Sequence, residues 1–163
     1  MRIIRIDKNN QVNGDGLRCV IWFAGCSHKC PGCHNPETWD FKCGHSITIE
    51  DLNTIYDQLE KDEISGITLT GGDPLYQDKD IAPFLRQIKF NFPNKDIWCY
   101  TGFLYEDIKH FESLKYIDVL VDGPYQQELN PGPGKVLWRG STNQRIIDVS
   151  ASLDNNEIIL YSE

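Results

Sequence analysis

The chain has 163 residues and a formal net charge of −8 at pH 7, with 40% hydrophobic and 25% charged residues. This length suits one domain, expected to span residues 1–163. The negative charge argues against a wide basic surface for nucleic acid or anionic lipid, and no apolar run approaches the roughly 18 residues that cross a bilayer. The start of the chain is charged from Arg2 onward, unlike a signal peptide, so we expect a cytoplasmic protein with reduced thiols.

Strands and helices are predicted to alternate along most of the chain. A first strand covers residues 2–6, and a continuous apolar run predicts a buried strand over 19–24. Thr48 and Asp51 predict the start of a helix over 48–59, followed by a strand over 66–70. Apolar residues at helical spacing predict a second helix from 81 to about 93, then a strand over 97–100, a short helix over 106–114 and a strand over 117–121.

This alternation predicts an α/β fold with a mostly parallel sheet and helices outside it. Four strands are too few for a closed eightfold barrel, so we expect an open partial (β/α) barrel or a strongly curved sheet. Ligands of such folds bind beyond the carboxyl ends of the strands. Those ends carry Gly25-Cys26, Gly71-Gly72-Asp73, Thr101-Gly102 and Asp122-Gly123. After a Pro- and Gly-rich loop, residues 146–149 and 158–161 are expected to pair as a hairpin.

Three of the six cysteines fall within eight residues, in the segment Cys26-Ser-His-Lys-Cys30-Pro-Gly-Cys33. In a reducing compartment this density indicates a metal site or catalysis. An iron–sulfur cluster normally takes four thiolates, so three ligands leave one iron open for substrate. Structural zinc, with Cys43 or His34 as fourth ligand, is the alternative, although a second cysteine pair is missing. Cys19 and Cys99 lie within apolar strands and are expected to be buried.

Six segments in a fixed order resemble the activating proteins of anaerobic (class III) ribonucleotide reductases, within the radical S-adenosylmethionine superfamily. The C-x3-C-x2-C loop after a strand and the Gly-Gly-acid turn after the next strand carry the superfamily resemblance. The matching segments begin and end at Asn13–Cys19, Gly25–Trp39, Leu69–Leu75, Lys95–Trp98 with Thr101-Gly102, Val119–Gly123 and Arg139–Gln144. The resemblance covers residues 12–145 and implies a radical S-adenosylmethionine type of partial barrel.

The resemblance implies a [4Fe–4S] cluster on Cys26, Cys30 and Cys33, with S-adenosylmethionine chelating the fourth iron. Reductive cleavage of S-adenosylmethionine would give a 5′-deoxyadenosyl radical that removes hydrogen from a glycine of the reductase, leaving a glycyl radical. No side chain receives a catalytic role. The expected cofactor contacts are Gly32, Cys33, His34, Gly71, Gly72 and Asp73.

The implied partners are the large subunit of the reductase, with its glycyl radical domain, and a flavodoxin-type or other low-potential electron donor. Asp73 departs from the Glu that is usual in the superfamily, and Gly32 replaces a residue that is often aromatic. Asn35, Thr101 and Asp122 are further candidates for contacts with the cofactor carboxylate or ribose. Arg18 and Arg139 are candidates for pairing with acids near the site or for holding the partner.

Three other functions stay open at this stage. The chain could activate a different glycyl radical enzyme, such as a formate-lyase, although those activases are usually longer. A zinc-stabilised binding module would not need the Gly71-Gly72 turn. A small electron carrier would normally have a fourth cysteine.

Overall fold

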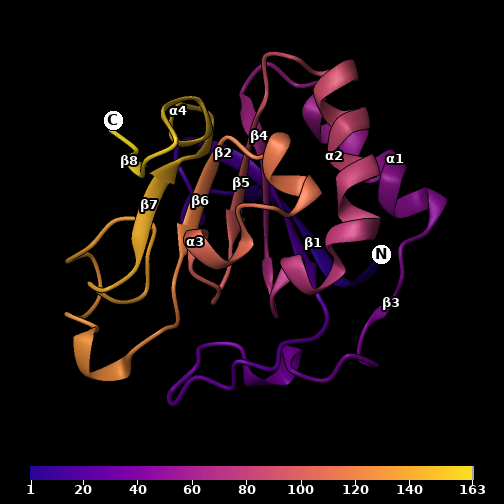
Figure 1. Cartoon of the computed structure of the whole chain (residues 1–163). Coiled ribbons are helices and arrows are strands. Elements are labelled where there is room, and N and C mark those ends of the chain that lie inside the picture. The colour runs from indigo at the N-terminus through magenta and orange to yellow at the C-terminus, as the bar shows by residue number, and fades with distance from the viewer. Residues whose placement is uncertain (163) are drawn as a thin grey trace.

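The structure is a computed structural model, and it describes residues 1–162. Those residues form one eight-stranded sheet in the order β3-β1-β2-β4-β5-β6-β7-β8 (Figure 1). The strands are β1 Arg2–Asn10, β2 Leu17–Phe23, β3 His45–Ser46, β4 Ile64–Gly71, β5 Asp96–Tyr100, β6 Val119–Asp122, β7 Arg145–Asp148 and β8 Ile159–Leu160. No helix within residues 1–162 combines the length and apolarity needed to cross a membrane.

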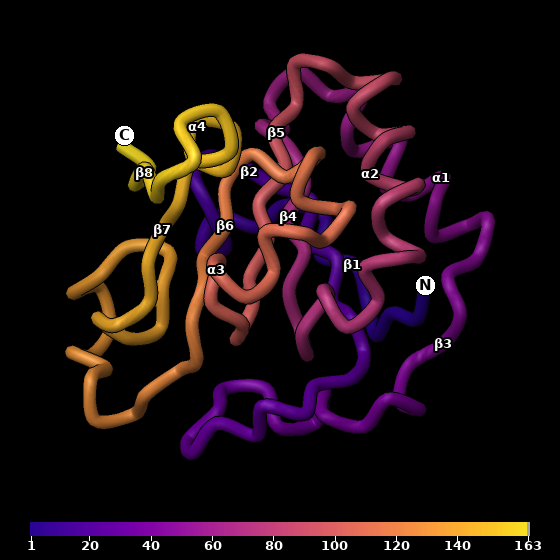
Figure 2. Tube along the Cα trace, viewed as in Figure 1, coloured from indigo at the N-terminus to yellow at the C-terminus, as the bar shows by residue number. Residues whose placement is uncertain are grey.

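Four α-helices and four 3-10 helices connect the described strands. The α-helices are α1 Ile49–Leu59, α2 Asp78–Asn91, α3 Tyr105–Ile108 and α4 Val149–Asn155. The 3-10 helices are η1 Pro36–Thr38, η2 Pro74–Gln77, η3 Glu112–Lys115 and η4 Gln127–Leu129. The trace in Figure 2 follows the chain from the N-terminus beside β1 to the C-terminus beside β8, so the ends lie toward opposite edges of the sheet.

The sheet is mixed, and the prediction of a mostly parallel, open partial barrel with helices outside is wrong. Only the central pairs β2–β4, β4–β5 and β5–β6 are parallel. The pairs β1–β2, β1–β3, β6–β7 and β7–β8 are antiparallel. The central βαβ connections could be predicted from the sequence because a helix follows each of these strands. The flanking antiparallel pairs could not, because they depend on long-range contacts without a local sequence pattern.

The predictions for individual helices and strands agree with the structure better than the predicted architecture does. The side chain of Thr48 accepts a hydrogen bond from Asp51 N, and the Asp51 carboxylate accepts one from Thr48 N, which is the predicted capping box. The predicted helix over 106–114 is divided into α3 and η3. The two C-terminal segments do pair, as β7 and β8, but α4 connects them in place of a tight turn.

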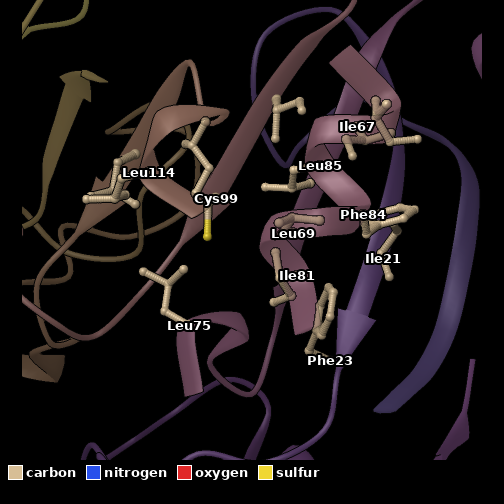
Figure 3. Packing of buried hydrophobic residues seen from close by; sticks show 14 of the residues in the cluster. Ile21, Phe23, Ile67, Leu69, Leu75, Ile81, Phe84, Leu85, Cys99 and Leu114 are labelled. Carbon is tan, nitrogen blue, oxygen red and sulfur yellow. The ribbon is translucent and has the colours of Figure 1, made fainter. Parts of the chain in front are cut away.

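One face of the sheet packs against α1 and α2 and forms the main core. Alternate residues of the strands point to this face, including Ile21 and Phe23 of β2, Leu69 of β4 and Cys99 of β5. Figure 3 shows Ile81 and Leu85 of α2 beside these strand residues. The core therefore fixes the parallel strands in register, so that β2, β4 and β5 end along a common edge.

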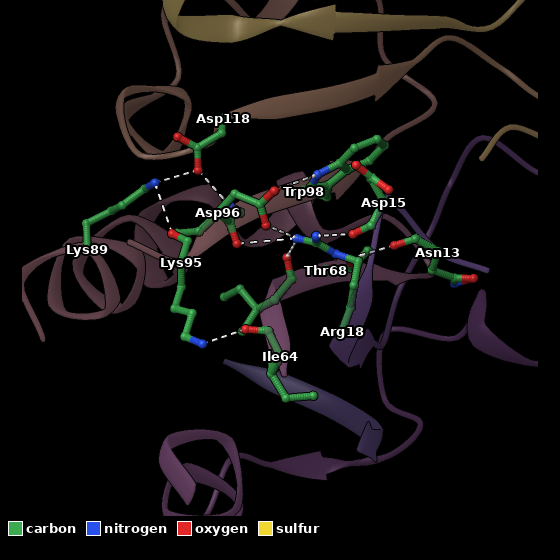
Figure 4. Close-up of polar contacts among 12 residues, drawn as sticks. Asn13, Asp15, Arg18, Ile64, Thr68, Lys89, Lys95, Asp96, Trp98 and Asp118 are labelled. Carbon is green, nitrogen blue, oxygen red and sulfur yellow. Dashed lines mark hydrogen bonds and ion pairs between the residues drawn. The ribbon is translucent and has the colours of Figure 1, made fainter. Parts of the chain in front are cut away.

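At the opposite edge, where the parallel strands begin, a buried arginine joins three of them. Arg18 of β2 is 0% exposed and donates to Thr68 Oγ1 at 2.7 Å, to Ile67 O at 2.8 Å and to Asp96 Oδ1 at 2.6 Å (Figure 4). It also donates to Asp15 O at 2.7 Å. A buried charge is tolerated only when hydrogen bonds and an opposite charge satisfy it, and Arg18 has both. Its role at the start of the strands is therefore structural.

Candidate metal centre and cofactor site

The segments that follow β2, β4 and β5 are held together by backbone hydrogen bonds. Gly72 N donates to Phe23 O at 2.8 Å, and Asp73 N donates to Gly25 O at 2.8 Å. Thr101 N donates to Val121 O at 2.9 Å, which joins the ends of β5 and β6. In Figure 1 the segment after β2 runs along the lower edge of the sheet. The predicted turns therefore meet at the carboxyl edge.

The cysteine loop, residues 25–34, is anchored at its start. Gly25 N donates to Thr38 O at 2.8 Å, and Cys26 N donates to Trp39 O at 3.1 Å. Later in the loop, Cys33 N donates to Cys30 O at 3.1 Å, closing a tight turn. Lys29 and Gly32 have positive φ values of 49° and 71°, which bend the loop back on itself. All three cysteines are free and half-buried.

Two of the three sulfur atoms already face backbone N–H groups. Burial raises the pKa of the Cys26 thiol and the negative charge of Asp73 adds to the rise, while hydrogen bonds from the backbone of His28 and Lys29 oppose it. Asn35 N donates to Cys33 Sγ at 3.4 Å. Hydrogen bonds to sulfur are typical of the thiolates that hold iron–sulfur clusters.

The donor set fits a thiolate-bound cluster, because three accessible thiols share one short loop. Within residues 1–162, however, no three side chains of His, Cys, Asp or Glu lie close enough together to hold a metal ion. The thiols would therefore have to converge when a cluster binds. The positive-φ turn at Gly32 is the part of the loop best suited to that adjustment.

Gly71 and Gly72 are glycines because two backbones approach closely there. Gly71 has a φ of 109°, and a Cβ at this position would lie 2.6 Å from both Phe23 N and Phe23 O. A Cβ on Gly72 would lie 2.8 Å from the carbonyl carbon of Gly25. The turn thus presents bare backbone beside the cysteine loop, and its contact with a cofactor stays a prediction.

The Asp73 carboxylate is buried and bonded on both oxygens. It is 1% exposed and accepts hydrogen bonds from Thr101 Oγ1 at 2.8 and 3.1 Å and from Gly102 N at 2.9 Å. It also accepts from Leu75 N at 3.0 Å, which caps η2. His28 Nε2 lies 2.7 Å from Asp73 Oδ2. The side chain of Asp73 therefore joins the ends of β4 and β5 to the cysteine loop.

His28 is the residue of this site that the sequence did not reveal. It lies between the first two cysteines, and its ring contacts Phe103 at 4.6 Å and Tyr76 at 5.5 Å between centroids. Its carboxylate partner is 45 residues further along the chain. The pair has no local sequence signal, because it forms only when β2 and β4 align.

The second half of the loop faces the segment after β6. The ring of His34 lies 4.7 Å from that of Tyr125, and the side chain of Gln127 occupies the space beside Gly32. The structure thus places Gly32 and His34 at the same edge as Gly71 and Gly72. Whether they contact a cofactor stays a prediction.

The further candidates are engaged in contacts within the chain. Thr101 donates to Asp73, and the backbone carbonyl of Asn35, at the start of η1, accepts a hydrogen bond from Thr38 Oγ1 at 2.7 Å, whereas the Asn35 side chain makes no cap hydrogen bond. Asp122 is 0% exposed and accepts from Tyr105 N at 2.8 Å and from Arg145, whose Nε lies 3.0 Å from Oδ1. Arg139 Nη1 donates to Gln144 O at 2.8 Å. Arg18 does pair with an acid, Asp96, but at the opposite edge of the sheet.

The remaining cysteines lie apart from the loop. Cys19 and Cys99 are 0% exposed, as predicted, and burial raises the pKa of Cys19 to about 12. The carbonyl oxygen of Cys43 accepts a hydrogen bond from Arg2 Nε at 2.8 Å. Two cavities among the described residues, of about 540 and 490 Å³, border α4 and β7, and neither is lined by a loop cysteine.

Comparisons with known proteins indicate the family of the chain. A family described as "4Fe-4S single cluster domain" matches residues 12–147. The anaerobic ribonucleoside-triphosphate reductase-activating protein of Enterobacteria phage T4 is 46% identical over 148 residues, covering 90% of this chain and 93% of that protein. The proteins of the same name from Pasteurella multocida and Escherichia coli (strain K12) are 36% identical over 155 residues and 38% identical over 139.

Those alignments cover 90% and 82% of this chain, and 96% and 89% of the two relatives. The similarity thus extends well beyond the cysteine loop and includes the carboxyl edge of the sheet. The chain belongs to the family of anaerobic ribonucleoside-triphosphate reductase-activating proteins and carries a 4Fe-4S single cluster domain.

Proposed function

We propose that the chain activates an anaerobic ribonucleotide reductase by cleaving S-adenosylmethionine reductively at a [4Fe–4S] cluster and forming a glycyl radical on the reductase. The observation that carries the proposal is the cysteine loop fastened, through Gly25 O and Asp73 N, to the Gly71-Gly72 turn. Thiol ligands and a bare backbone turn are thereby adjacent. The names of the relatives supply the reductase as target.

Cys26, Cys30 and Cys33 are the proposed cluster ligands. When bound, the cluster supplies the single electron that the reductive cleavage of S-adenosylmethionine requires. The chain contributes backbone N–H groups at Cys26 and Cys33, which stabilise sulfur in its anionic form. Three protein ligands would leave one position open for the cofactor.

The remaining proposed contacts with S-adenosylmethionine come from both sides of that position. On one side is the backbone of the Gly71-Gly72-Asp73 turn, whose two glycines allow it to pack directly against Phe23 and Gly25 beside the cysteine loop. On the other side are Gly32, Cys33 and His34 at the end of the loop. These residues orient the ligand and limit the access of water, while the cofactors carry the redox chemistry.

The proposed protein partners are the large subunit of the reductase, through its glycyl radical domain, and a flavodoxin-type or other low-potential electron donor. Two exposed apolar side chains lie at the carboxyl edge: Phe41, 49% exposed, is beside Gly25 at the start of the loop, and Leu104, 44% exposed, is beside Gly123 after β6. Exposed apolar side chains near a reactive site are suited to contact with a protein substrate.

Anaerobic reconstitution with iron and sulfide tests the proposal. The protein should become brown, and after reduction it should convert S-adenosylmethionine to methionine and 5′-deoxyadenosine in equal amounts. Addition of candidate reductases should give a glycyl radical signal in electron paramagnetic resonance. A colourless protein that holds one zinc ion and cleaves no S-adenosylmethionine would contradict the proposal. A radical on a formate-lyase only would change the partner but keep the chemistry.

A further inference from the structure

We propose that Asp73, His28, Thr101 and Gly102 form a clasp that fixes the cysteine loop beside the Gly71-Gly72 turn before any cofactor binds. Asp73 and His28 are then positioning residues, and their side chains do not bind the cofactor. The consequence for catalysis rests on the proposed function, whereas the clasp itself is a property of the cofactor-free chain.

The Asp73 side chain has no capacity left for a ligand. A carboxylate offers about four acceptor positions. Thr101, Gly102, Leu75 and His28 already occupy both oxygens at distances of 2.7–3.1 Å. With 1% exposure, the carboxylate could reach a cofactor only by breaking these bonds. Removing a partner from a buried, bonded carboxylate is costly, so the carboxylate acts within the protein.

His28 connects that buried carboxylate to the loop. Its side chain is 17% exposed, and a Cβ on Gly102 would lie 2.6 Å from the imidazole ring. The ring thus contacts Gly102, Phe103 and Tyr76. Next to it, Ser27 Oγ lies 2.5 Å from the hydroxyl of Tyr76. Two consecutive loop residues are therefore held by segments that follow β4 and β5.

The clasp holds the loop unevenly. Cys26 lies directly before the clasped residues and is also bonded through its N–H to Trp39 O. Cys30 and Cys33 follow the positive-φ residue Lys29 and are joined mainly to each other. The first ligand is thus preset against the Gly71-Gly72 turn, and the other two can adjust. Presetting the geometry reduces the ordering that ligand binding would otherwise require.

Hydrogen exchange of the cofactor-free protein tests the clasp directly. His28→Phe retains an aromatic ring between Tyr76 and Phe103 but removes the bond to Asp73. We expect amide exchange in residues 24–30 to accelerate about tenfold in this variant, because a hydrogen bond to a charged group is lost. Thr101→Val, which removes the hydroxyl donor at nearly constant volume, should accelerate the same amides. The double variant should exceed the larger single effect only slightly, since both changes open one clasp.

The matched control is a second histidine–aspartate pair. His45 Nε2 lies 2.9 Å from Asp51 Oδ2 and joins β3 to the first turn of α1. His45→Phe should leave exchange in residues 24–30 unchanged. Unchanged exchange in both His28→Phe and Thr101→Val would overturn the clasp, and so would equal acceleration in the control.

The reconstituted enzyme gives a second readout. His28→Phe should retain wild-type iron and sulfide content but raise the KM for S-adenosylmethionine about tenfold, with a smaller change in kcat. A residue that only stabilises the fold would not produce this split in a folded sample. If wild-type protein binds a cluster but cleaves nothing, the proposed function fails while the exchange result still stands. An unchanged KM with accelerated exchange would overturn the catalytic consequence alone.

Discussion

At the residue scale, the six cysteines of the chain lie in different surroundings. Cys19 and Cys99 are enclosed by the core, where burial raises the pKa of both thiols and keeps them protonated. Cys26, Cys30 and Cys33 are half-buried on one loop, with backbone N–H groups beside the sulfur atoms of Cys26 and Cys33. Cys43 is equally accessible but lies on a different segment, next to Arg2.

Replacement of single cysteines should distinguish the proposed cluster ligands from the other cysteines. Cys26→Ala, Cys30→Ala and Cys33→Ala should each abolish cluster binding and S-adenosylmethionine cleavage, because two thiolates cannot retain the cluster. Iron and sulfide per chain and the visible absorbance measure the outcome. Cys43→Ala is the matched control and should load a cluster normally. Loss of the cluster in Cys43→Ala would instead identify Cys43 as a ligand.

The closeness of two backbones at Gly72 gives a second prediction at this scale. Gly72→Ala should lower the free energy of unfolding by about 1–3 kcal/mol, because the new methyl group overlaps the backbone of Gly25. Amide exchange of the cysteine loop should accelerate with it. Gly132→Ala is the control, since a Cβ there meets nothing within 4 Å and only the φ of 96° is unfavourable. Unaltered loop exchange in Gly72→Ala would contradict the close approach.

At the scale of elements, Arg145 joins three segments near the carboxyl edge. From β7 it contacts Asp122 of β6, and it donates to both carboxylate oxygens of Glu106 in α3, at 3.0 and 2.7 Å. Hydrogen bonds from Arg145 lower the pKa of Glu106 to about 2. The same pairing raises the pKa of Arg145, which therefore stays charged. α3 is only four residues long, so this contact substitutes for the packing that a longer helix would provide.

The stability that this pair contributes should depend on pH. Because the pKa of Glu106 is lower in the folded chain than its ordinary value of 4.5, the contribution is complete above pH 4.5 and disappears as the pH falls toward 2. The Glu106 side chain is 55% exposed, so solvent screening limits the effect to about 1 kcal/mol or less. Urea unfolding of Glu106→Gln should differ from wild type at neutral pH and converge with it in acid.

Glu128→Gln provides the control for this measurement. Glu128 is exposed and has no ion pair among the described contacts. Its replacement should leave stability nearly unchanged at every pH. A difference between wild type and Glu106→Gln that persists at pH 2 would show that the carboxylate charge is not the cause.

The elements differ in how far the sequence could predict them. The strand end at Gly71, and the ends two residues before Gly25 and Gly102, were predictable because glycine and the apolar runs before it are local signals. The contact between His28 and Asp73 was not, because it joins residues 45 positions apart. The proposed cysteine ligands were predicted from their spacing and from the family resemblance, whereas the hydrogen bonds to the Asp73 carboxylate come from Thr101 and Gly102 after β5, which no local pattern places beside it.

At the scale of the whole molecule, the two ends of the parallel strands have different roles. The starting edge contains the buried network of Arg18, with Lys89, Lys95 and Asp118 beside it (Figure 4). The ending edge carries the cysteine loop and the clasp. The mixed architecture arises from β1, β7 and β8, whose antiparallel pairing extends the sheet on both sides of the parallel centre.

Replacement of Arg18 should test this division. Arg18→Met should lower the free energy of unfolding by about 3 kcal/mol or more, since buried acceptors on β4 and β5 lose their donor. The fraction that remains folded should still load the cluster fully, because the network lies at the other edge. Arg139→Met, which removes a single donor to Gln144 O, should cost about 1 kcal/mol. Defective loading in folded Arg18→Met would link the two edges.

The outer strands have a consequence for handling the protein without its cofactors. An open sheet has two borders, and here they are β3 and β8, each of two residues. β3 covers only Arg2 and Ile3 of β1, so from Ile4 to Asn10 the outer edge of β1 has no strand partner within residues 1–162. A strand from a second molecule could pair with that edge, so cofactor-free chains at the concentrations used for reconstitution should associate there more readily than at β8.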